Sequence, residues 1–248
     1  MAQFWKAVNE VIKRSQILLL VLDARMVEET RNIEIERKID ELGKQLIYVI
    51  TKCDLVDQDF AEKNKKKFPN AVFVSATKFH GLSILKEKIM IEAKRTGVKK
   101  GPIYVGVVGY PNVGKSSLIN VITGRGAASV SVLSGHTKGL KMINAFSNIV
   151  LFDSPGVIPY KEKDDMKHAL IGTIDFTRSK DPEAVAMELM KLYPGRIERF
   201  YGVKVNEDFE ETINSIAVKK NILKKGAVPD MQRMARVILK DWQKGEIK

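Results

Sequence analysis

The segment 109–116 reads G-Y-P-N-V-G-K-S and matches the phosphate-binding pattern G-x-x-x-x-G-K-[ST]. The apolar run Ile103–Val108 that enters it is typical of a buried strand, and Ser117–Ile122 can continue as a helix. In such a unit the glycines let backbone N–H groups surround phosphate oxygens, and the helix N-terminus adds positive potential. The pattern therefore predicts an α/β fold with a nucleotide site, the alternative being a glycine-rich turn that binds nothing.

Within this loop the side chains have separate expected roles. Lys115 is expected to reach the β- and γ-phosphates, and Ser116 is expected to ligate Mg²⁺. The other expected nucleotide contacts in the loop and its helix are Asn112, Val113, Gly114 and Ser117.

Four further apolar runs lack the period-two alternation of half-exposed strands, as strands covered on both faces should. Helix-length polar segments separate them, for example Arg31–Leu42, which stops at Gly43. Alternating strands and helices predict a doubly wound α/β sheet. The four runs are Ile17–Leu22, Leu46–Ile50, Ala71–Val74 and Ile149–Phe152.

The chain divides by pattern into residues 1–164 and 165–248. A basic, glycine-containing stretch at about 94–102 is expected to link two halves of the first part. After Asp164 the strand pattern fades, and three segments predict a small all-α domain: Asp181–Leu192, Asp208–Lys219 and Asp230–Lys244.

Two short motifs indicate which base is bound. Residues 51–54 read T-K-C-D, of the form [NT]-K-x-D, and follow a predicted strand. The Asp54 carboxylate can accept both the N1 and N2 protons of guanine, which adenine cannot offer, while the stem of Lys52 can cover the base. The triplet Ser75-Ala76-Thr77 follows the next strand and fits an S-A-[KT] element whose backbone N–H contacts guanine O6.

The tetrad 153–156 reads D-S-P-G and follows another strand. Asp153 could hold Mg²⁺ through water, and the N–H of Gly156 could bind the γ-phosphate. Each short motif alone is as easily structural as functional. Together they are stronger evidence, because all four motifs follow strands, and ligands of doubly wound sheets bind at the carboxyl ends of the strands.

The motifs resemble those of the translation-factor-like GTPases, but the guanine-reading motifs precede the phosphate loop here. This order resembles the circularly permuted ribosome-assembly GTPases of the YlqF/YawG (RbgA-like) group. Asp23-Ala24-Arg25 resembles the group's D-A-R element, and 226–247 resembles its C-terminal helical domain. The resemblance implies binding of GTP/GDP with Mg²⁺, GTP hydrolysis, and ribosomal RNA or a large-ribosomal-subunit precursor as partner. Movement of Gly156 would pass directly into the helical domain, unless the helices merely cap the sheet.

The resemblance also points to Thr137 as the switch threonine that completes the Mg²⁺ shell. The position after D-x-x-G, where many GTPases have a water-positioning glutamine, is Val157, so unassisted hydrolysis should be slow.

Two residues could replace the missing glutamine. Asn112 corresponds to a monovalent-cation ligand in potassium-activated relatives, or it forms an Asx turn. His136 is a second substitute, or simply a solvated loop residue. The candidate catalytic residues are Lys115, Asn112, Thr137 and Gly156; the candidate metal ligands are Ser116, Thr137 and Asp153.

The charge balance, 42 basic against 30 acidic side chains and a net +12, favours a polyanionic partner such as RNA. The basic stripe Arg233, Arg236, Lys240 and Lys244 is an RNA contact or a solvated helix face. Two alternative functions remain. One is a GTP-dependent protein-binding switch without RNA; the other is an ATP-dependent enzyme, against which Asp54 and Ala76 argue.

The cellular compartment is predicted from the single Cys53 and from the absence of a secretory or membrane-spanning apolar run. Both indicate a cytoplasmic protein.

Overall fold

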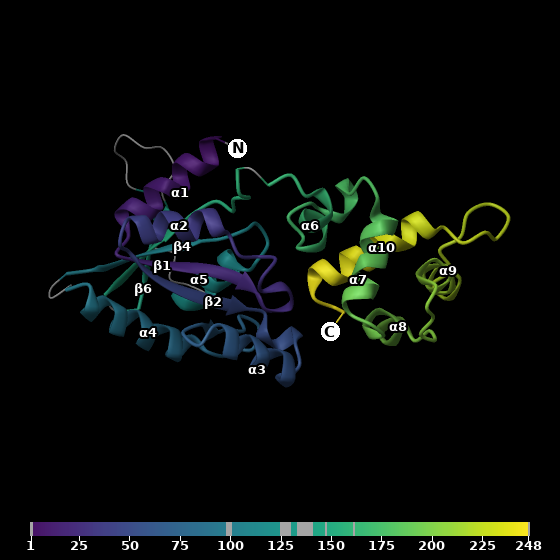
Figure 1. Ribbon diagram of the computed structural model, residues 1–248, viewed down its shortest axis with the longest axis horizontal. Coiled ribbons are helices and arrows are strands. Elements are labelled where there is room, and N and C mark those ends of the chain that lie inside the picture. The colour runs from purple at the N-terminus through teal and green to yellow at the C-terminus, as the bar shows by residue number, and fades with distance from the viewer. Residues whose placement is uncertain are drawn as a thin grey trace. The chain divides into compact units, whose positions relative to one another are not determined.

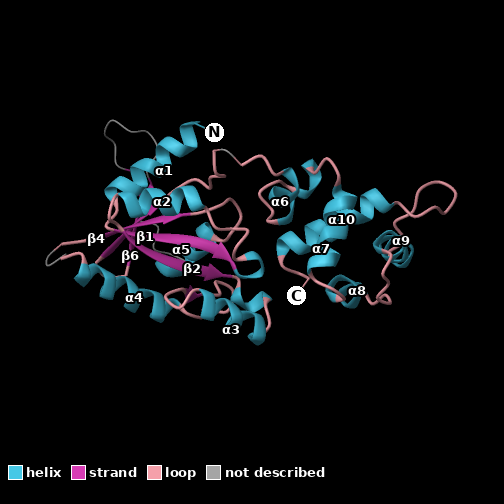
Figure 2. Cartoon of the chain, viewed as in Figure 1, coloured by secondary structure: helices cyan, strands magenta, loops and turns pink. Residues whose placement is uncertain are grey.

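The computed structural model describes residues 2–97, 101–124, 130–132, 141–146, 148–160 and 162–247. Its internal contacts divide the chain into two compact units, Met1–Glu162 and Lys163–Lys248. The first unit is a sheet covered by helices, and the second is built from helices (Figures 1 and 2).

The first unit holds a seven-stranded sheet in the order β3-β2-β1-β4-β7-β6-β5. Five strands are parallel, and they are the five that the apolar runs predict: β1 (Ile17–Asp23), β2 (Gln45–Thr51), β3 (Val72–Phe73), β4 (Ile103–Val108) and β7 (Ile149–Asp153). Two further strands, β6 (Lys141–Ala145) and β5 (Val130–Val132), continue the sheet with antiparallel pairing. The predicted doubly wound α/β sheet is therefore confirmed, with an antiparallel edge that the sequence did not predict.

Burial explains which strands the sequence revealed. Every residue of β1 is buried, as a central strand with helices on both faces requires. In β6 only Ile143 and Ala145 are buried, while Lys141 and Asn144 are exposed. A short half-exposed strand of this kind has no continuous apolar run, so the pattern used for the other strands does not detect it.

Helices cover both faces of the sheet, with α1 and α2 on one face and α4 on the other (Figure 1). Their bounds are α1 (Ala2–Arg14), α2 (Ile33–Glu41), α3 (Gln58–Lys67), α4 (Leu82–Arg95) and α5 (Lys115–Thr123). Side-chain caps set two of the starts: Asn32 accepts from the N–H of Ile35 over 3.1 Å, and Asp57 accepts from that of Phe60 over 2.7 Å. Because α4 continues through Arg95, the first residues of the stretch expected to be a linker are helical instead.

The second unit contains α6 (Asp165–Leu170), α7 (Pro182–Leu192), α8 (Arg196–Tyr201), α9 (Phe209–Lys219) and α10 (Met231–Lys244). The three predicted helices are α7, α9 and α10, and each begins one residue after the expected aspartate. Those aspartates, Asp181, Asp208 and Asp230, are N-caps whose carboxylates accept a backbone N–H three residues ahead. Among the described residues no helix is both long and apolar enough to cross a membrane.

Candidate functional site

The carboxyl ends of the parallel strands lie together at one edge of the sheet. Asp23 at the end of β1 pairs in register with Thr51 at the end of β2. On the other side of β1, Val107 near the end of β4 pairs with Asp153 at the end of β7. All four predicted motifs begin at or just beyond this edge, which is where open α/β sheets bind their ligands.

The phosphate-binding loop follows β4 and ends at Gly114, the N-cap of α5. Gly114 has a φ of 100°, and Gly109 has a φ of 142° with so little space that an added Cβ would lie 2.6 Å from the carbonyl oxygen of Val21. Both positions need glycine, because side chains strain at such φ values and the backbone at Gly109 packs directly on β1. The loop therefore has the compact form that a phosphate-binding turn requires.

Lys115 lies inside this loop, with only 7% of its surface exposed. Its Nζ donates hydrogen bonds to the carbonyl oxygens of Gly109 and Tyr110. Burial lowers the pKa of Lys115 to about 8, and the nearby Asp153 carboxylate opposes that shift. A polyanion at this position would favour the charged form of the amine.

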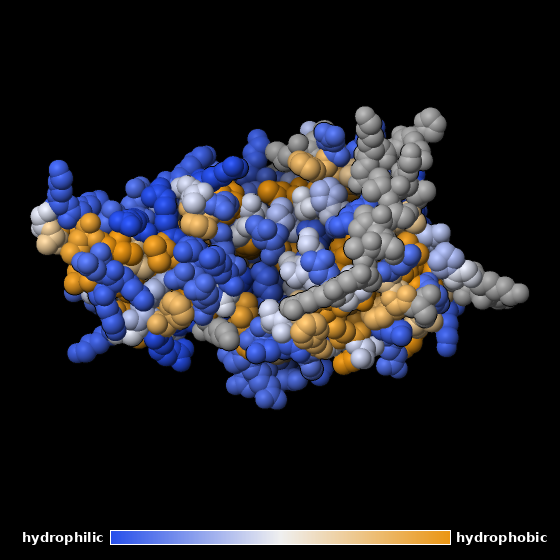
Figure 3. Space-filling view, turned by 180° about the vertical axis from the view of Figure 1, so that it is seen from behind, coloured by the Kyte–Doolittle hydropathy of each residue, from blue (hydrophilic) through white to orange (hydrophobic). Residues whose placement is uncertain are grey.

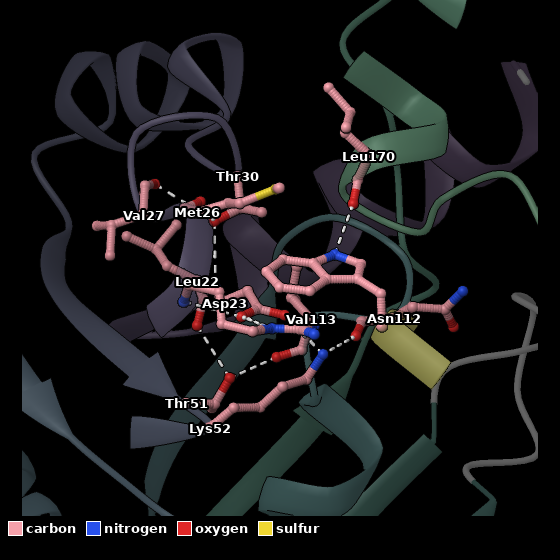
Figure 4. A network of polar contacts seen from close by, with 12 residues as sticks. Leu22, Asp23, Met26, Val27, Thr30, Thr51, Lys52, Asn112, Val113 and Leu170 are labelled. Carbon is pink, nitrogen blue, oxygen red and sulfur yellow. Dashed lines mark hydrogen bonds and ion pairs between the residues drawn. The ribbon is translucent and has the colours of Figure 1, made fainter. Parts of the chain in front are cut away.

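Thr51 joins the loop to the guanine-reading motif. Its Oγ1 lies 2.9 Å from the carbonyl oxygen of Leu22 and 2.5 Å from that of Val113 (Figure 4). A Cβ added to Gly114 would lie 3.1 Å from the same Thr51 oxygen. The loop thus packs on the end of β2 through this threonine.

The two base-reading motifs meet through side chains 23 positions apart. Thr77 Oγ1 donates to Asp54 Oδ2 over 3.0 Å, and Ser75 Oγ lies 3.1 Å from Thr77 Oγ1. Ser75 Oγ also accepts from the N–H of Lys78, so it holds the turn that contains Ala76. The structure therefore brings the predicted guanine-reading carboxylate beside the predicted O6-contacting turn.

The D-x-x-G tetrad lies against the phosphate-binding loop. A Cβ added to Gly156 would lie 2.6 Å from Pro111 Cα and 3.0 Å from Lys115 Nζ, so only glycine fits there. The N–H of Val157 donates to the carbonyl oxygen of Gly109 over 3.3 Å. Ser154, two residues before Gly156, donates a hydrogen bond from its Oγ to the carbonyl oxygen of Val107 in β4 over 2.7 Å.

Two of the three predicted Mg²⁺ ligands, Ser116 and Asp153, lie at this edge of the sheet. Ser116 supplies an exposed hydroxyl at the first turn of α5, and Asp153 supplies a carboxylate from the end of β7. Burial raises the pKa of Asp153, while Lys141 and Lys115 oppose the rise. No cluster of three or more His, Cys, Asp or Glu side chains suited to a metal occurs in the described ranges.

The remaining residues singled out in the sequence are placed as follows. Thr137 and His136 lie outside the described residues, as do Ser134 and Gly135. Asn112 is exposed and has a left-handed backbone with φ 61°, and its carbonyl oxygen accepts from Lys52 Nζ over 3.0 Å. Val157 is only 3% exposed and belongs to the core of the sheet, so its side chain does not face a phosphate site.

Several contacts at this edge were not predicted from the sequence. Asp23 forms ion pairs with Arg25 and Lys52. The phenol of Tyr110, in the phosphate-binding loop, lies 2.9 Å from both carboxylate oxygens of Glu162. The adjacent acid and base in Asp23-Ala24-Arg25 are a local signal for the first pair. No local pattern points to the Tyr110–Glu162 contact, which joins residues 52 positions apart.

A P-loop, a D-x-x-G tetrad beside it and the predicted guanine-reading motifs after neighbouring strands are the arrangement of a P-loop GTPase domain. Its motif order is circularly permuted, because the strands that carry the base-reading motifs precede the phosphate-binding strand in the chain.

Comparison with known proteins agrees with this class. Residues 104–188 match the family described as "50S ribosome-binding GTPase". That match begins in β4 and leaves out 51–77, as expected when the base-reading motifs have moved ahead of the loop. The chain is 40% identical over 98% of its length to a GTP-binding protein of Methanocaldococcus jannaschii, covering 65% of that protein. It is 32% identical over 99% of its length to nucleolar GTP-binding protein 2 of Saccharomyces cerevisiae, covering 52%.

The fold matches that of GNP-bound YlqF from T. maritima, with a TM-score of 0.65, 21% identity, and coverage of 98% of this chain and 94% of that one. The chain therefore shares the fold of a circularly permuted YlqF GTPase and is similar to GTP-binding proteins, in agreement with the resemblance found in its sequence. It spans about half to two thirds of the length of the two curated relatives named above.

Proposed function

We propose that this protein hydrolyses GTP to GDP and phosphate and uses that cycle as a switch in assembly of the large ribosomal subunit. The observation that carries the enzymatic part is the meeting of Asp54 with Thr77 at the same sheet edge that holds Lys115 and Asp153. That arrangement supports the proposal, because it would put a base-reading carboxylate and a phosphate-binding amine in one site.

The bound nucleotide would be held at both ends. Asp54 would accept hydrogen bonds from guanine N1 and N2, with the N–H of Ala76 directed to O6. Lys115 and the N–H groups of Val113, Gly114, Ser116 and Ser117 would surround the phosphates at the N-terminus of α5. Ser116 and Asp153 would hold Mg²⁺, which stabilises the negative charge that develops on the phosphates.

Hydrolysis by this chain alone should be slow. The side chain at the position after Gly156 is Val157, which is apolar and packed in the core, so it cannot orient the attacking water. A monovalent cation bound by Asn112, a group in the loop that contains His136 and Thr137, or a group from the partner would have to supply the missing stabilisation.

The segment that follows Gly156 would carry the nucleotide state to the helical unit. In the first unit, Asn32 Nδ2 donates to the carbonyl oxygen of Val157 over 3.3 Å, and the N–H of Tyr160 donates to Glu34 over 3.0 Å. Any displacement of Gly156 by a γ-phosphate would disturb these bonds. The same segment leads directly into residues 163–248, so the change would reach that unit through the chain itself.

The partner part of the proposal rests on charge and on the relatives. The relatives include nucleolar GTP-binding proteins, and the matching family is described by binding to the 50S ribosome. The net charge of +12 suits ribosomal RNA. Hydrophilic residues cover much of the face seen in Figure 3. On α10, Arg233 and Lys244 are exposed and Arg236 and Lys240 are half-buried. The single Cys53 suits a reducing compartment, so we propose the cytoplasm as the location.

The deciding experiment is co-sedimentation with large ribosomal subunits and their precursors. It compares GDP with a non-hydrolysable GTP analogue, and the wild type with Lys115→Ala. Stronger pelleting with the GTP analogue in the wild type alone supports the switch. Nucleotide-dependent binding to a protein partner that is insensitive to salt and to ribonuclease would favour the alternative of a switch without RNA.

A further inference from the structure

A buried cluster of three charged side chains lies at the ends of β1 and β2, beside the phosphate-binding loop. Asp23 and Arg25 are 3% and 4% exposed, and Lys52 is half-buried. Charged side chains are rarely buried to this degree unless their partners fix them in place. Of the three residues, only Lys52 has a role in the proposed nucleotide site, where its stem would cover the base; that role does not account for Asp23 and Arg25.

Asp23 is the centre of the cluster. Its carboxylate accepts from Arg25 Nε over 3.0 Å and from a second guanidinium nitrogen over 2.8 Å, in bidentate fashion. The same carboxylate accepts from Lys52 Nζ over 2.6 Å. The backbone N–H of Asp23 donates to Thr30 Oγ1 over 3.1 Å, which fixes the end of β1 (Figure 4).

Lys52 links the cluster to the phosphate-binding loop through a hydrogen bond. Its Nζ donates to the carbonyl oxygen of Asn112 over 3.0 Å while it remains paired with Asp23. Lys52 is also one of the few non-glycine residues with a left-handed backbone, at φ 57°. Such a conformation is strained for a residue other than glycine and persists where surrounding contacts hold it. The contacts of the Lys52 side chain with Asp23 and with the carbonyl oxygen of Asn112 can hold this backbone conformation in place.

The charges in the cluster depend on one another. Burial alone would raise the pKa of Asp23, but Arg25 and Lys52 outweigh burial and hold it well below its usual range. Burial lowers the pKa of Lys52, and the Asp23 carboxylate is the largest influence that opposes this. Without Asp23, Lys52 would lose both its anchor and the charge that favours its ionised form.

We propose that Asp23 is a positioning residue for the nucleotide site: it holds Lys52 between the end of β1 and the carbonyl of Asn112, so that the base-reading segment 51–54 and the phosphate-binding loop act as one preorganised surface. Arg25 also neutralises the Asp23 carboxylate and so lets it stay buried. This inference rests on the proposed binding of guanine nucleotide. It adds a role for a residue that contacts neither the base nor the phosphates.

The test is a double-mutant cycle on the affinity for a fluorescent GDP analogue, using Asp23→Asn, Lys52→Met and the combined variant. Each single change removes a charge-assisted bond on which the site depends, so each should weaken binding about tenfold. The combined variant should bind no more than about threefold worse than the weaker single variant, because both changes break the same link.

Glu36→Gln is the matched control. Glu36, on α2, is the bidentate carboxylate partner of Arg31, at 2.9 and 2.6 Å, so the change removes this ion pair without touching Lys52. A purely structural loss of this kind lowers the stability of the fold and leaves the GDP affinity of the folded protein within about twofold of wild type. If Asp23→Asn leaves Arg25 unpaired and does not fold, Asp23→Asn with Arg25→Gln removes both charges, and Lys52→Met tests the link from the other side.

Unchanged GDP affinity in folded Asp23→Asn or in Lys52→Met overturns the inference, as do additive losses in the combined variant. Failure of the proposed function gives a different result, because the wild type itself would then not bind the GDP analogue. The two failures are therefore separated within one set of titrations.

Discussion

The indole Nε1 of Trp5 donates a hydrogen bond to the carbonyl oxygen of Ile158 over 3.0 Å, although 153 positions separate the two residues. Trp5 lies on α1, at the start of the chain, and Ile158 lies two residues beyond the D-x-x-G tetrad. The N-terminal helix is therefore in contact with the segment that leaves the nucleotide site. Lys38 Nζ, 4.2 Å from the centre of the Trp5 ring, adds a cation–π contact that holds the indole in this position.

Replacement of Trp5 by Phe should lower the free energy of unfolding by about 1–2 kcal/mol. The aromatic ring is kept, but the Ile158 carbonyl loses its donor. Urea unfolding followed by circular dichroism measures the change. Phe4→Leu is the control, since Phe4 is 55% exposed and its replacement should change stability by less than about 0.5 kcal/mol. Equal stability of Trp5→Phe and wild type would show that the contact contributes nothing to the fold.

Guanine selectivity should depend on Asp54. We expect Asp54→Asn to weaken GTP binding by at least about a hundredfold and to improve binding of xanthosine triphosphate, because the amide reverses one donor–acceptor pair. Competition titrations with both nucleotides measure the change. Asp57→Asn is the matched control, three residues away, where the side chain caps α3 and points to Phe60. Unchanged GTP affinity in Asp54→Asn would contradict the assignment of 51–54.

Nucleotide binding should take up a proton near pH 8. Burial holds the pKa of Lys115 at about 8 in the free protein, so about half of the molecules carry a neutral amine at that pH. Phosphate groups favour the ammonium form and raise its pKa, so binding should draw in about 0.5 proton at pH 8 and almost none at pH 6.5. Calorimetry of GDP binding in buffers of different ionisation enthalpy measures this.

The lowered pKa of Lys115 also predicts how the stability of the free protein changes with pH. The unfolded chain binds the Lys115 proton more tightly than the folded chain, so this residue should make the free protein more stable as pH rises from about 8 to about 10.5. Lys115→Arg keeps its charge across this range and should show neither the proton uptake nor this contribution to the pH dependence. Proton uptake of equal size in Lys115→Arg would assign it to another group.

GTP hydrolysis should be faster in K⁺ than in Na⁺ at equal ionic strength if Asn112 is a cation ligand. The informative variant is Asn112→Gly, because the left-handed backbone at φ 61° accepts glycine without strain, whereas alanine would add strain of its own. The variant should hydrolyse GTP at the same low rate in both salts. Equal wild-type rates in K⁺ and Na⁺ would eliminate the potassium hypothesis and favour a partner group or His136.

Charge reversal of Arg233, Arg236 and Lys240 to Glu should weaken binding to ribosomal particles and reduce the slope of log affinity against log salt by up to about 2–3. The buried face of α10, with Met234 and Trp242, is left intact, so GTP affinity should not change. The matched control reverses the same number of charges at Lys191, Lys204 and Lys225, exposed residues elsewhere in the same unit. Wild-type binding by the α10 variant would show that the stripe is a solvated face and that the RNA contact lies elsewhere, at Lys63–Lys67 or Lys94–Lys100.

The sequence by itself determined the parallel strands, the four motifs and the helix starts at Asp181, Asp208 and Asp230. These features depend on local information: a continuous apolar run, a glycine at a fixed spacing, or a carboxylate three residues ahead of the N–H that it caps. It also determined that the motifs share one edge, since the carboxyl ends of parallel strands lie together whatever their order in the chain.

Tertiary structure alone decided which groups far apart in the chain come into contact around the site. The pairs Asp23 with Lys52, Thr51 with Val113, and Trp5 with Ile158 depend on the strand order β2-β1-β4, on the register and on the placement of α1. Each pair joins segments between 29 and 153 positions apart. Local preferences do not encode such distances, because many registers and crossings suit the same apolar pattern and only the packed core selects one of them.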